Sequence, residues 1–372
     1  MVKIAAFLVI IALKCANRYV IIIIANFEQY SLGGKKMNRN IDNLLYYVEK
    51  SVKEHELETG KYARWLLQDK DGTRDLGSSE YGCADAANIL YTIGKFPRDL
   101  AVREACVKEL QRMQKPDGRF EEPTHHTLHT TAHCVAALEL FDAAPLLPLT
   151  YHLENFGTIE KSLAFLEGLG WDWHPWDMSH QGAGYYAAMA LCCDMPMEWH
   201  DAYFDWLAAN VDQKTGIGRE GAHNGKRSMI HHLAGWFHYM FNHIYAHRPM
   251  PNAEKAVDTM IDYYSNDLRY CKGHPFGQRM GFAEIDWTFI LNRASMQTGH
   301  RREEAKALIR EFADKYLDFL EADIETAYKT RFDDLHMLFG AMCAVAEMQI
   351  ALPGEIKSTI PLKNVLDRRP FI

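Results

Sequence analysis

Three histidines recur at a constant interval in this sequence of 372 residues, and the interval suggests a shared pocket. His129, His180 and His231 follow one another after 51 residues each. This interval lies near the length of helical repeats, whose equivalent positions line one side of the molecule. Two further steps of the same length reach Phe282 and Asp333, and carboxylates lie beside both. Imidazoles and carboxylates are the usual proton donors and acceptors of enzymes, so the pattern predicts acid–base chemistry.

The polar and aromatic side chains around these positions divide into two predicted groups. The group predicted to transfer protons consists of Asp177, His180, Asp286 and Asp334. The group predicted to hold the substrate consists of Tyr81, His129, Trp176, Arg219, His231, Arg279, Glu284 and Trp287. Hydrolysis of a glycosidic bond would need two carboxylates, either about 5–5.5 Å or about 6.5–9.5 Å apart. Elimination from a uronate would instead need a neutral histidine, such as His180, and an arginine that neutralises the enolate.

These candidates also have structural alternatives. An aspartate close to the start of a helix, as predicted for Asp286, is favoured as an N-cap. The tryptophans of the segment Trp171–Asp177 would serve either as core residues or as an aromatic wall for a ligand. His126, His129 and His133 have the spacing of one helical face. The motif His-Glu-x-x-His is absent, however, so we predict neither a metal ion nor a cofactor.

Helices must position these side chains. Helical periodicity dominates from Ile41 onward, and apolar residues do not alternate with polar ones as they do in strands. The pattern predicts helix pairs, in which a charged outer helix precedes an inner helix rich in small residues. The inner helices are predicted to start near Tyr81, Leu128, His180, Ile230, Ala283 and Asp333. Small residues in them recur at about 50 residues or a near multiple, namely Ala87, Ala137, Ala188, Gly235 and Gly340.

The predicted fold class is therefore all-α, a closed (α/α)6 ring of about six helical hairpins around one pocket. An open superhelix of stacked hairpins is the alternative. An open array needs polar terminal repeats, whereas the segment 341–352 near the C-terminal end stays apolar. No linker rich in Gly, Ser or Pro divides the chain after residue 40, so residues 37–372 are predicted to form a single domain.

Residues 1–36 differ from the repeats that follow. Lys3 precedes an apolar run, Ile4–Leu13, and a second run covers Val20–Ala25. Both runs are shorter than the ~18 residues needed to cross a bilayer. The first run has the length of a signal-peptide core, but no clear Ala-x-Ala cleavage site follows. The alternatives are a signal peptide or anchor, or an extension upstream of a functional start at Met37. A membrane partner is expected only if this segment is an anchor.

Composition narrows the choice of partner and compartment. The formal net charge is −8, and no basic stripe is present, which argues against nucleic acid as a partner. The eight cysteines include no Cys-x-x-Cys pair, and most lie in apolar helical surroundings. This pattern suits a reducing compartment, so we expect a cytoplasmic protein. A secreted or anchored protein is the alternative if residues 1–36 are a targeting segment.

A sequence motif also resembles a known superfamily. The segment "LQRMQKPDGRF", which contains Gln114–Phe120, and the following "HTTAHCVAALELF" resemble the hairpin repeat of the α/α toroids. These include terpenoid cyclases, prenyltransferase β subunits, polysaccharide lyases and six-hairpin glycosidases. The resemblance covers about residues 60–350 and selects no single family. It implies a closed helical ring whose pocket rim lies at the loops that enter the inner helices.

Three functions remain open at this point. A carbohydrate-active enzyme, either a glycoside hydrolase or a polysaccharide lyase acting on an acidic glycan or oligosaccharide, fits the carboxylates, histidines, arginines and aromatic residues together. A terpenoid cyclase or prenyltransferase would carry Asp-x-Asp-Asp or Asp-Asp-x-x-Asp by resemblance, whereas the segment after Asp333 and Asp334 lacks the last aspartate. A non-catalytic binding toroid is the third possibility. We expect the carbohydrate-active enzyme, with a small molecule or an oligosaccharide as its substrate.

Overall fold

A computed structural model describes residues 8–15, 18–25, 36–270 and 276–370. The chain is mostly helical, at 61% helix, which confirms the predicted all-α character. It forms two compact units, residues 1–36 and residues 37–372. Within the first unit, β1 (Leu8–Cys15) and β2 (Arg18–Ala25) pair as antiparallel strands, with Leu8 opposite Ala25. The two strands of this hairpin thus overlap the two apolar runs noted in the sequence.

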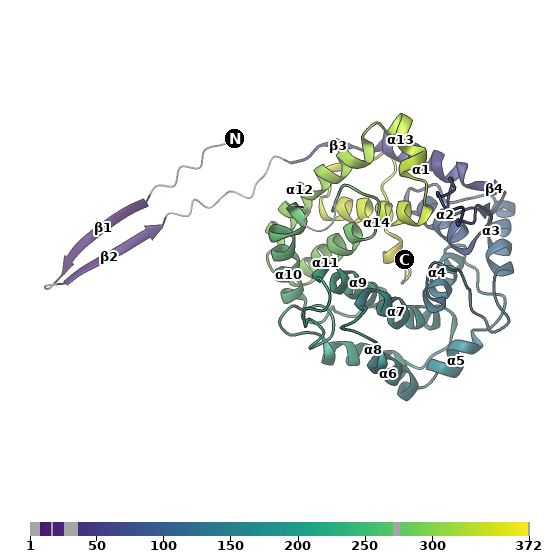
Figure 1. Ribbon diagram of the computed structural model, residues 1–372, viewed down its shortest axis with the longest axis horizontal. Coiled ribbons are helices and arrows are strands. Elements are labelled where there is room, and N and C mark those ends of the chain that lie inside the picture. Colours follow the sequence, from purple (N-terminus) through teal and green to yellow (C-terminus); the bar gives the residue numbers. More distant parts are fainter. Residues whose placement is uncertain (1–7, 16–17, 26–35, 271–275, 371–372) are drawn as a thin grey trace. The chain divides into compact units, whose positions relative to one another are not determined.

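Six helices of the second unit contact one another in a closed circuit, which we call the inner circuit. They are α2 (Glu80–Thr92), α4 (Thr127–Leu140), α7 (Pro175–Cys192), α9 (Met229–Tyr245), α11 (Ala283–Thr298) and α14 (Leu335–Ala351). Each helix contacts the next one in this order, and α14 contacts α2 (Figure 1). Their starts lie close to the six positions predicted from the small-residue pattern.

Eight further helices lie outside the inner circuit (Figure 1). They are α1 (Asp42–Glu54), α3 (Leu100–Arg112), α5 (Thr150–Phe156), α6 (Ile159–Gly168), α8 (Met197–Asn210), α10 (Ala253–Asn266), α12 (Arg302–Glu321) and α13 (Ile324–Arg331). Each inner helix is preceded by at least one of them, as the predicted pairing requires. Their buried residues, such as Leu308 and Phe312 of α12, recur on one face, while charged residues occupy the other.

Glycine allows the inner helices to approach closely. A Cβ atom added at Gly184 of α7 would lie 2.9 Å from the carbonyl oxygen of Leu128, at the start of α4. A Cβ at Gly235 of α9 would lie 2.7 Å from the carbonyl oxygen of Pro175, at the start of α7. Each helix thus packs directly against the first turn of the preceding inner helix. This packing brings the side chains at the helix starts together.

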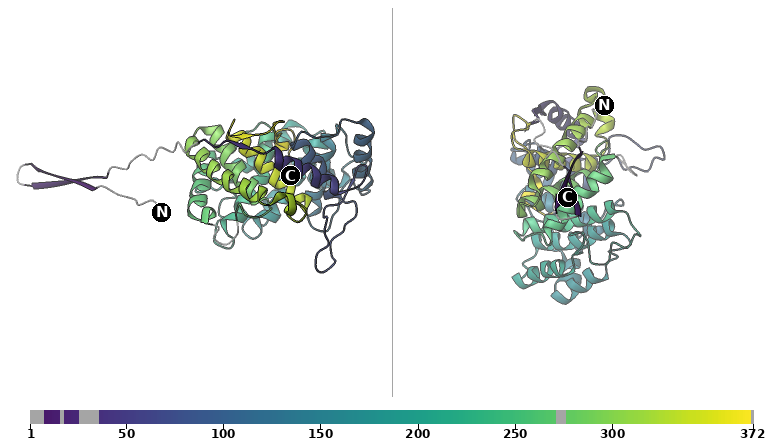
Figure 2. Two further views of the ribbon diagram at one scale, coloured as in Figure 1. Left: turned by 90° about the horizontal axis from the view of Figure 1, so that it is seen from above. Right: turned by 90° about the vertical axis from the view of Figure 1, so that its left-hand side faces the viewer.

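The remaining elements of the second unit are short strands and 3-10 helices. A parallel pair, β3 (Arg39–Asn40) and β6 (Ile356–Lys357), links residues far apart in the sequence, and β4 (Glu56–Glu58) pairs with β5 (Lys61–Tyr62). The segment between β5 and α2 projects from the layer of helices (Figure 2). One short 3-10 helix, η1 (Leu268–Tyr270), follows α10.

The C-terminal segment lies among the inner helices (Figure 1). Its 3-10 helix η2 (Val365–Asp367) contacts both α2 and α9, which are not neighbours in the circuit. Arg369 is fully buried and donates a hydrogen bond to Oδ1 of Asn88 on α2. This segment therefore fills part of the interior of the inner circuit.

Six cysteines in the described part of the chain are free thiols, and four of them are buried in the core. Burial raises the pKa of the Cys83 thiol to about 11. None of the described helices combines the length and the apolar character that crossing a bilayer requires.

Candidate functional site

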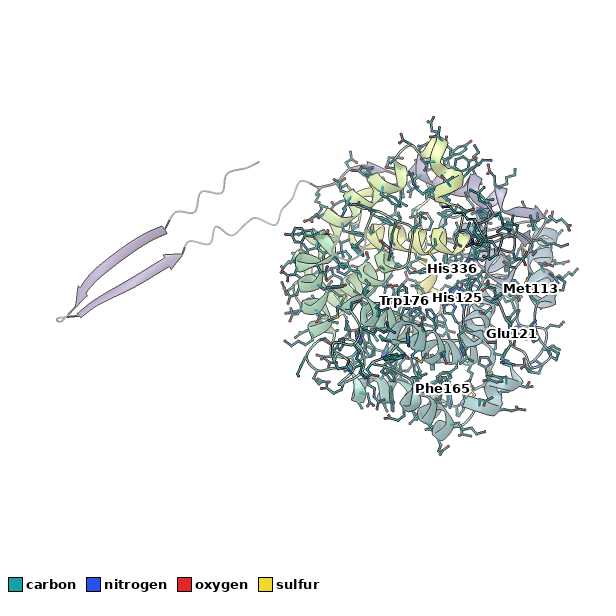
Figure 3. The ribbon with its side chains drawn as sticks, viewed as in Figure 1. Met113, Glu121, His125, Phe165, Trp176 and His336 are labelled. Atoms are coloured by element: carbon teal, nitrogen blue, oxygen red, sulfur yellow. The ribbon has the colours of Figure 1, made fainter. Side chains whose placement is uncertain are left out.

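A cavity of about 240 Å³ opens where the inner helices begin. Five imidazoles line it, together with one tryptophan and one arginine. The lining residues are His125, His129, Trp176, His180, His238, Arg279, Met280, Gly281, Phe282, His336 and Met337. Figure 3 labels His125, Trp176 and His336, which lie close to the centre of the second unit. Among these lining residues, none is a carboxylate.

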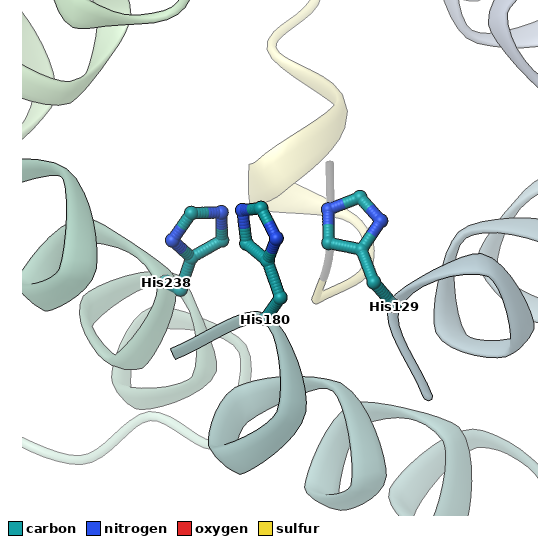
Figure 4. Close-up of side chains that lie close together, drawn as sticks. All are labelled: His129, His180 and His238. Carbon is teal, nitrogen blue, oxygen red and sulfur yellow. The ribbon is translucent and has the colours of Figure 1, made fainter. Parts of the chain in front are cut away.

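Three of the histidines form a compact cluster, which we call the three-histidine cluster (Figure 4). His129, His180 and His238 project from α4, α7 and α9, and one ring nitrogen of each lies within 4.8 Å of the others. The ring centroids are 4.4 Å apart for His129 and His180, and 4.8 Å apart for His180 and His238. Three adjacent helices of the inner circuit therefore direct imidazoles to one point.

Hydrogen bonds orient two rings of this cluster. Nδ1 of His238 donates to the carbonyl oxygen of Ala234 at 2.9 Å. A carbonyl oxygen only accepts, so the proton of this ring is on Nδ1 and Nε2 carries the lone pair. Nδ1 of His129 lies 2.5 Å from the hydroxyl of Tyr81, which is buried on α2. In both rings Nδ1 is therefore bonded to another protein group.

A second group lies next to the first and contains a buried carboxylate, that of Asp85. Oδ1 of Asp85 lies 2.9 Å from Nε2 of His133 and 3.2 Å from Nδ1 of His336. All three residues are buried. His336 uses Nδ1 for this bond and also lines the cavity, so its other nitrogen, Nε2, is the one available to a ligand. A buried aspartate that fixes a histidine in this way is familiar from catalytic triads.

Burial favours the neutral form of four of the cavity imidazoles, those of His129, His180, His238 and His336. Desolvation, together with the neighbouring histidines, lowers the pKa of His129 and of His180 well below the usual value. Desolvation also lowers the pKa of His238 to about 3 and that of His336 to about 4. Burial alone would raise the pKa of Asp85, but the interactions with His336 and His133 hold it below its usual value. The site therefore contains neutral bases beside one buried anion.

Arg279 and Trp176 complete the cavity. Arg279 is exposed, lines the cavity and forms no hydrogen bond or ion pair with the residues that the structure describes. Its guanidinium is thus available to an anionic ligand. Trp176 is partly exposed and lines both this cavity and a neighbouring hollow. The arrangement suits a ligand with an acidic group and a flat apolar face.

Two shallower hollows adjoin the cavity. One shares His125, Trp176 and His180 with it, and also includes Asp177. The other shares Met280 and Met337 with it. Its lining also includes four charged side chains that are not part of the cavity, namely Arg74, Arg331, Asp333 and Asp334. The three depressions therefore form one extended site.

The structure brings together four of the residues predicted from the sequence. His129, Trp176, His180 and Arg279 line the cavity. Tyr81 lies directly behind it, in contact with His129. His231 lies outside the lining, with its ring centroid 6.1 Å from that of Trp176.

The three predicted aspartates lie outside the cavity. Asp177 is exposed in one adjoining hollow, 3.3 Å from Nδ1 of His174. Asp334 lies in the other, caps α14 and pairs with Arg64 at 2.9 Å. Asp286 is fully buried, and neither of its carboxylate oxygens has a hydrogen-bond partner in the described structure. Burial and the nearby Glu284 raise the pKa of Asp286 well above its usual value.

The last three predicted residues have structural contacts instead of a place in the cavity. Arg219 forms an ion pair with Glu167. The Glu284 carboxylate accepts a hydrogen bond from the backbone N–H of Gly277 at 2.9 Å. Trp287 is fully buried, stacks on Tyr264 and donates from Nε1 to the carbonyl oxygen of Met260. Trp287 is therefore a core residue and not an aromatic wall for a ligand.

His238, His336, Asp85 and His125 were not among the selected candidates, although the sequence contained a signal for His238. His238 lies seven residues after His231, which is two helical turns along the same face. The interval of 51 residues did not identify the cavity residue of α9, because the histidines at this interval lie at different distances from the starts of their helices. His180 is the sixth residue of α7, whereas His231 is the third of α9 and His238 the tenth. The Asp85 group is assembled by contact between α2, α4 and α14. No pattern within one segment of the sequence indicates this contact.

No family model, no curated protein and no solved structure matches this chain. The chemistry of the site therefore carries the functional inference.

Proposed function

We propose that the chain is an (α/α)6 toroid enzyme that cleaves an acidic glycan by β-elimination at a uronate. The observation that carries this proposal is the composition of the cavity. Five imidazoles, one unpaired guanidinium and one tryptophan line it, with no carboxylate among the described lining residues. The closed circuit of inner helices supports the toroid assignment.

The proposed reaction uses two cavity residues directly. Arg279 binds the uronate carboxylate and neutralises the charge that develops when the adjacent C–H bond is broken. Nε2 of His336 accepts that proton, while the buried Asp85 holds the ring and stabilises the imidazolium that forms. The electron pair of the C–H bond forms the new carbon–carbon double bond, and the glycosidic C–O bond breaks. The imidazolium then returns the proton to the departing oxygen.

The low pKa of His336 fits this role. At neutral pH the ring is unprotonated, as a base must be, because burial lowers its pKa to about 4. A bound uronate adds negative charge beside the ring and favours its protonated form. Asp85 acts through His336 and is a positioning residue, since it does not line the cavity.

Hydrolysis fits the cavity less well than elimination. A glycosidase needs a carboxyl pair, and the nearest predicted carboxylates lie in the two adjoining hollows. An isoprenoid substrate fits less well again, because a hydrocarbon offers no partner to a wall of imidazoles. The proposed compartment is the cytoplasm, which agrees with the free thiols of the described cysteines.

The test is incubation of the full chain with a panel of neutral and uronic-acid oligosaccharides. Elimination is recognised by ultraviolet absorbance of the unsaturated uronate and by the masses of the products. His336→Gln should lower kcat by about 10²–10⁴. Arg279→Gln should raise KM and also lower kcat, because Arg279 both binds the carboxylate and neutralises the developing charge. His200→Gln is the matched control, because His200 lies on the outer helix α8 and contacts Tyr186. Absence of an unsaturated product from every uronate in the panel would overturn the proposal.

A further inference from the structure

We propose that the three-histidine cluster binds one divalent transition-metal ion of the zinc class. His129, His180 and His238 would supply one nitrogen each, and the remaining position would face the cavity. Metal binding here does not depend on the elimination reaction, because it follows from the ligands alone. It differs from the sequence prediction of no metal, which relied on a contiguous motif.

The positions of the three rings fit such an ion. One nitrogen of each lies within 4.8 Å of the others. Zn–N bonds of about 2.0–2.1 Å in a tetrahedron place ligand nitrogens about 3.3 Å apart, so a contraction of at most about 1.5 Å is needed. His180 can supply most of this movement, because it is only partly buried and makes no hydrogen bond with the described residues. The other two rings are buried on neighbouring helices.

The hydrogen bonds behind the cluster are those that metal-binding histidines usually make. The Nδ1–H of His238 bonds to a backbone carbonyl, and Nδ1 of His129 bonds to the hydroxyl of Tyr81. Such partners fix the tautomer and the ring orientation of a metal ligand. Ser179 adds a further contact, with its hydroxyl 3.1 Å from Nδ1 of His238. Because Nδ1 of His238 donates to the backbone carbonyl of Ala234, Nε2 is the nitrogen that would bind the metal.

Few charged groups face the proposed ligands. The other ionisable groups lining the cavity are His125, His336 and Arg279. Only Arg279 is a permanent cation, and it lies on an exposed loop, while the buried Asp85 contacts His336.

The Asp85 group is a weaker candidate. Its members, Asp85, His133 and His336, are also close enough to hold an ion. Both histidines, however, already bond to the same carboxylate oxygen. The group is fully buried, whereas three histidines with an open fourth position are typical of catalytic zinc sites. Water or an anionic group of the substrate would occupy that fourth position.

The experiment measures metal binding without any glycan. The full chain is stripped with a chelator, dialysed and titrated with Co²⁺, whose visible absorbance reports tetrahedral coordination, and Zn²⁺ is then added in competition. We expect one Co²⁺ per chain, displaced by Zn²⁺, and a zinc-dependent rise in Tm. His180→Ala should weaken binding at least tenfold, and its partial exposure makes loss of the fold improbable. His200→Ala, on the outer helix α8, is the control.

Three outcomes would overturn the metal site. They are no stoichiometric binding at micromolar Co²⁺, unchanged binding in His180→Ala, or binding that is lost in Asp85→Asn but retained in His180→Ala. The last result would assign the ion to the Asp85 group. Each outcome leaves the elimination proposal to its own test, since that test detects an unsaturated product. Conversely, a chain that binds Co²⁺ and cleaves no uronate contradicts only the proposed function.

Discussion

Single buried histidines influence the stability of this molecule as well as its chemistry. His152 on α5 is fully buried, and neither ring nitrogen has a hydrogen-bond partner in the described structure. Desolvation lowers its pKa from 6.5 to about 4. Below pH 6.5 the unfolded chain therefore binds a proton that the folded chain does not, and stability falls as the pH falls toward 4.

His152→Leu should remove this penalty. We expect the variant to gain stability relative to the parent as the pH falls, by about 1.4 kcal/mol per pH unit between pH 6.5 and 4. Urea denaturation of both proteins at several pH values measures the difference. His300→Leu is the control, because His300 is partly exposed and bonds to Asp258, and it should give no such gain. Parallel pH profiles for His152→Leu and the parent would contradict the expectation.

Individual residues of the site could be predicted from the sequence only in part. The histidine interval led to His129 and His180, which line the cavity, because both lie near the starts of inner helices. It could not distinguish Asp286, which is buried in the core, from a cavity residue, because both fall at similar repeat positions. The partners that decide such cases, among them Arg64 for Asp334, are distant in the sequence and are fixed only by the fold.

At the scale of elements, the close approach of inner helices depends on individual glycines. Gly235→Ala would place a methyl group 2.7 Å from the carbonyl oxygen of Pro175, a backbone atom that moves only with α7. We expect a loss of about 1–3 kcal/mol in the free energy of unfolding. Gly168→Ala is the matched control, since nothing lies within 4 Å of its Cβ position. That change should be neutral or stabilising in the same denaturation experiment.

The elements themselves were largely predictable. Small-residue segments identified the inner helices because close packing demands small side chains at each contact, and this demand repeats along the chain. The short helices α5 and α13 and the two-residue strands have no such periodic signal. The hairpin of β1 and β2 lies in a segment whose apolar runs indicated only a targeting sequence or an extension. Short apolar runs carry no period that separates strand from helix.

At the scale of the whole molecule, the boundary at Lys36 predicts what truncation does. A chain that starts at Met37 should keep its Tm within a few degrees, because residues 1–36 form a separate compact unit. A chain that starts at Asp42 should melt at least several degrees lower. It loses the β3–β6 pair and the ion pairs of Arg39 with Asp318 at 2.7 Å and Glu321 at 2.6 Å. Thermal melts of the three chains test this, and a large drop on removing residues 1–36 alone would contradict it.

The pairing of β3 with β6 has a consequence for biosynthesis. The backbone N–H of Arg39 in β3 donates to the carbonyl oxygen of Glu355, directly before β6, at 2.9 Å. At translation rates of about 5–20 residues per second, β3 waits on the order of tens of seconds until β6 leaves the ribosome. During that time the apolar faces of α2 and α11 lack the neighbour that α14 will provide. Nascent chains of this protein should therefore be substrates for chaperones until α14 and β6 have left the ribosome.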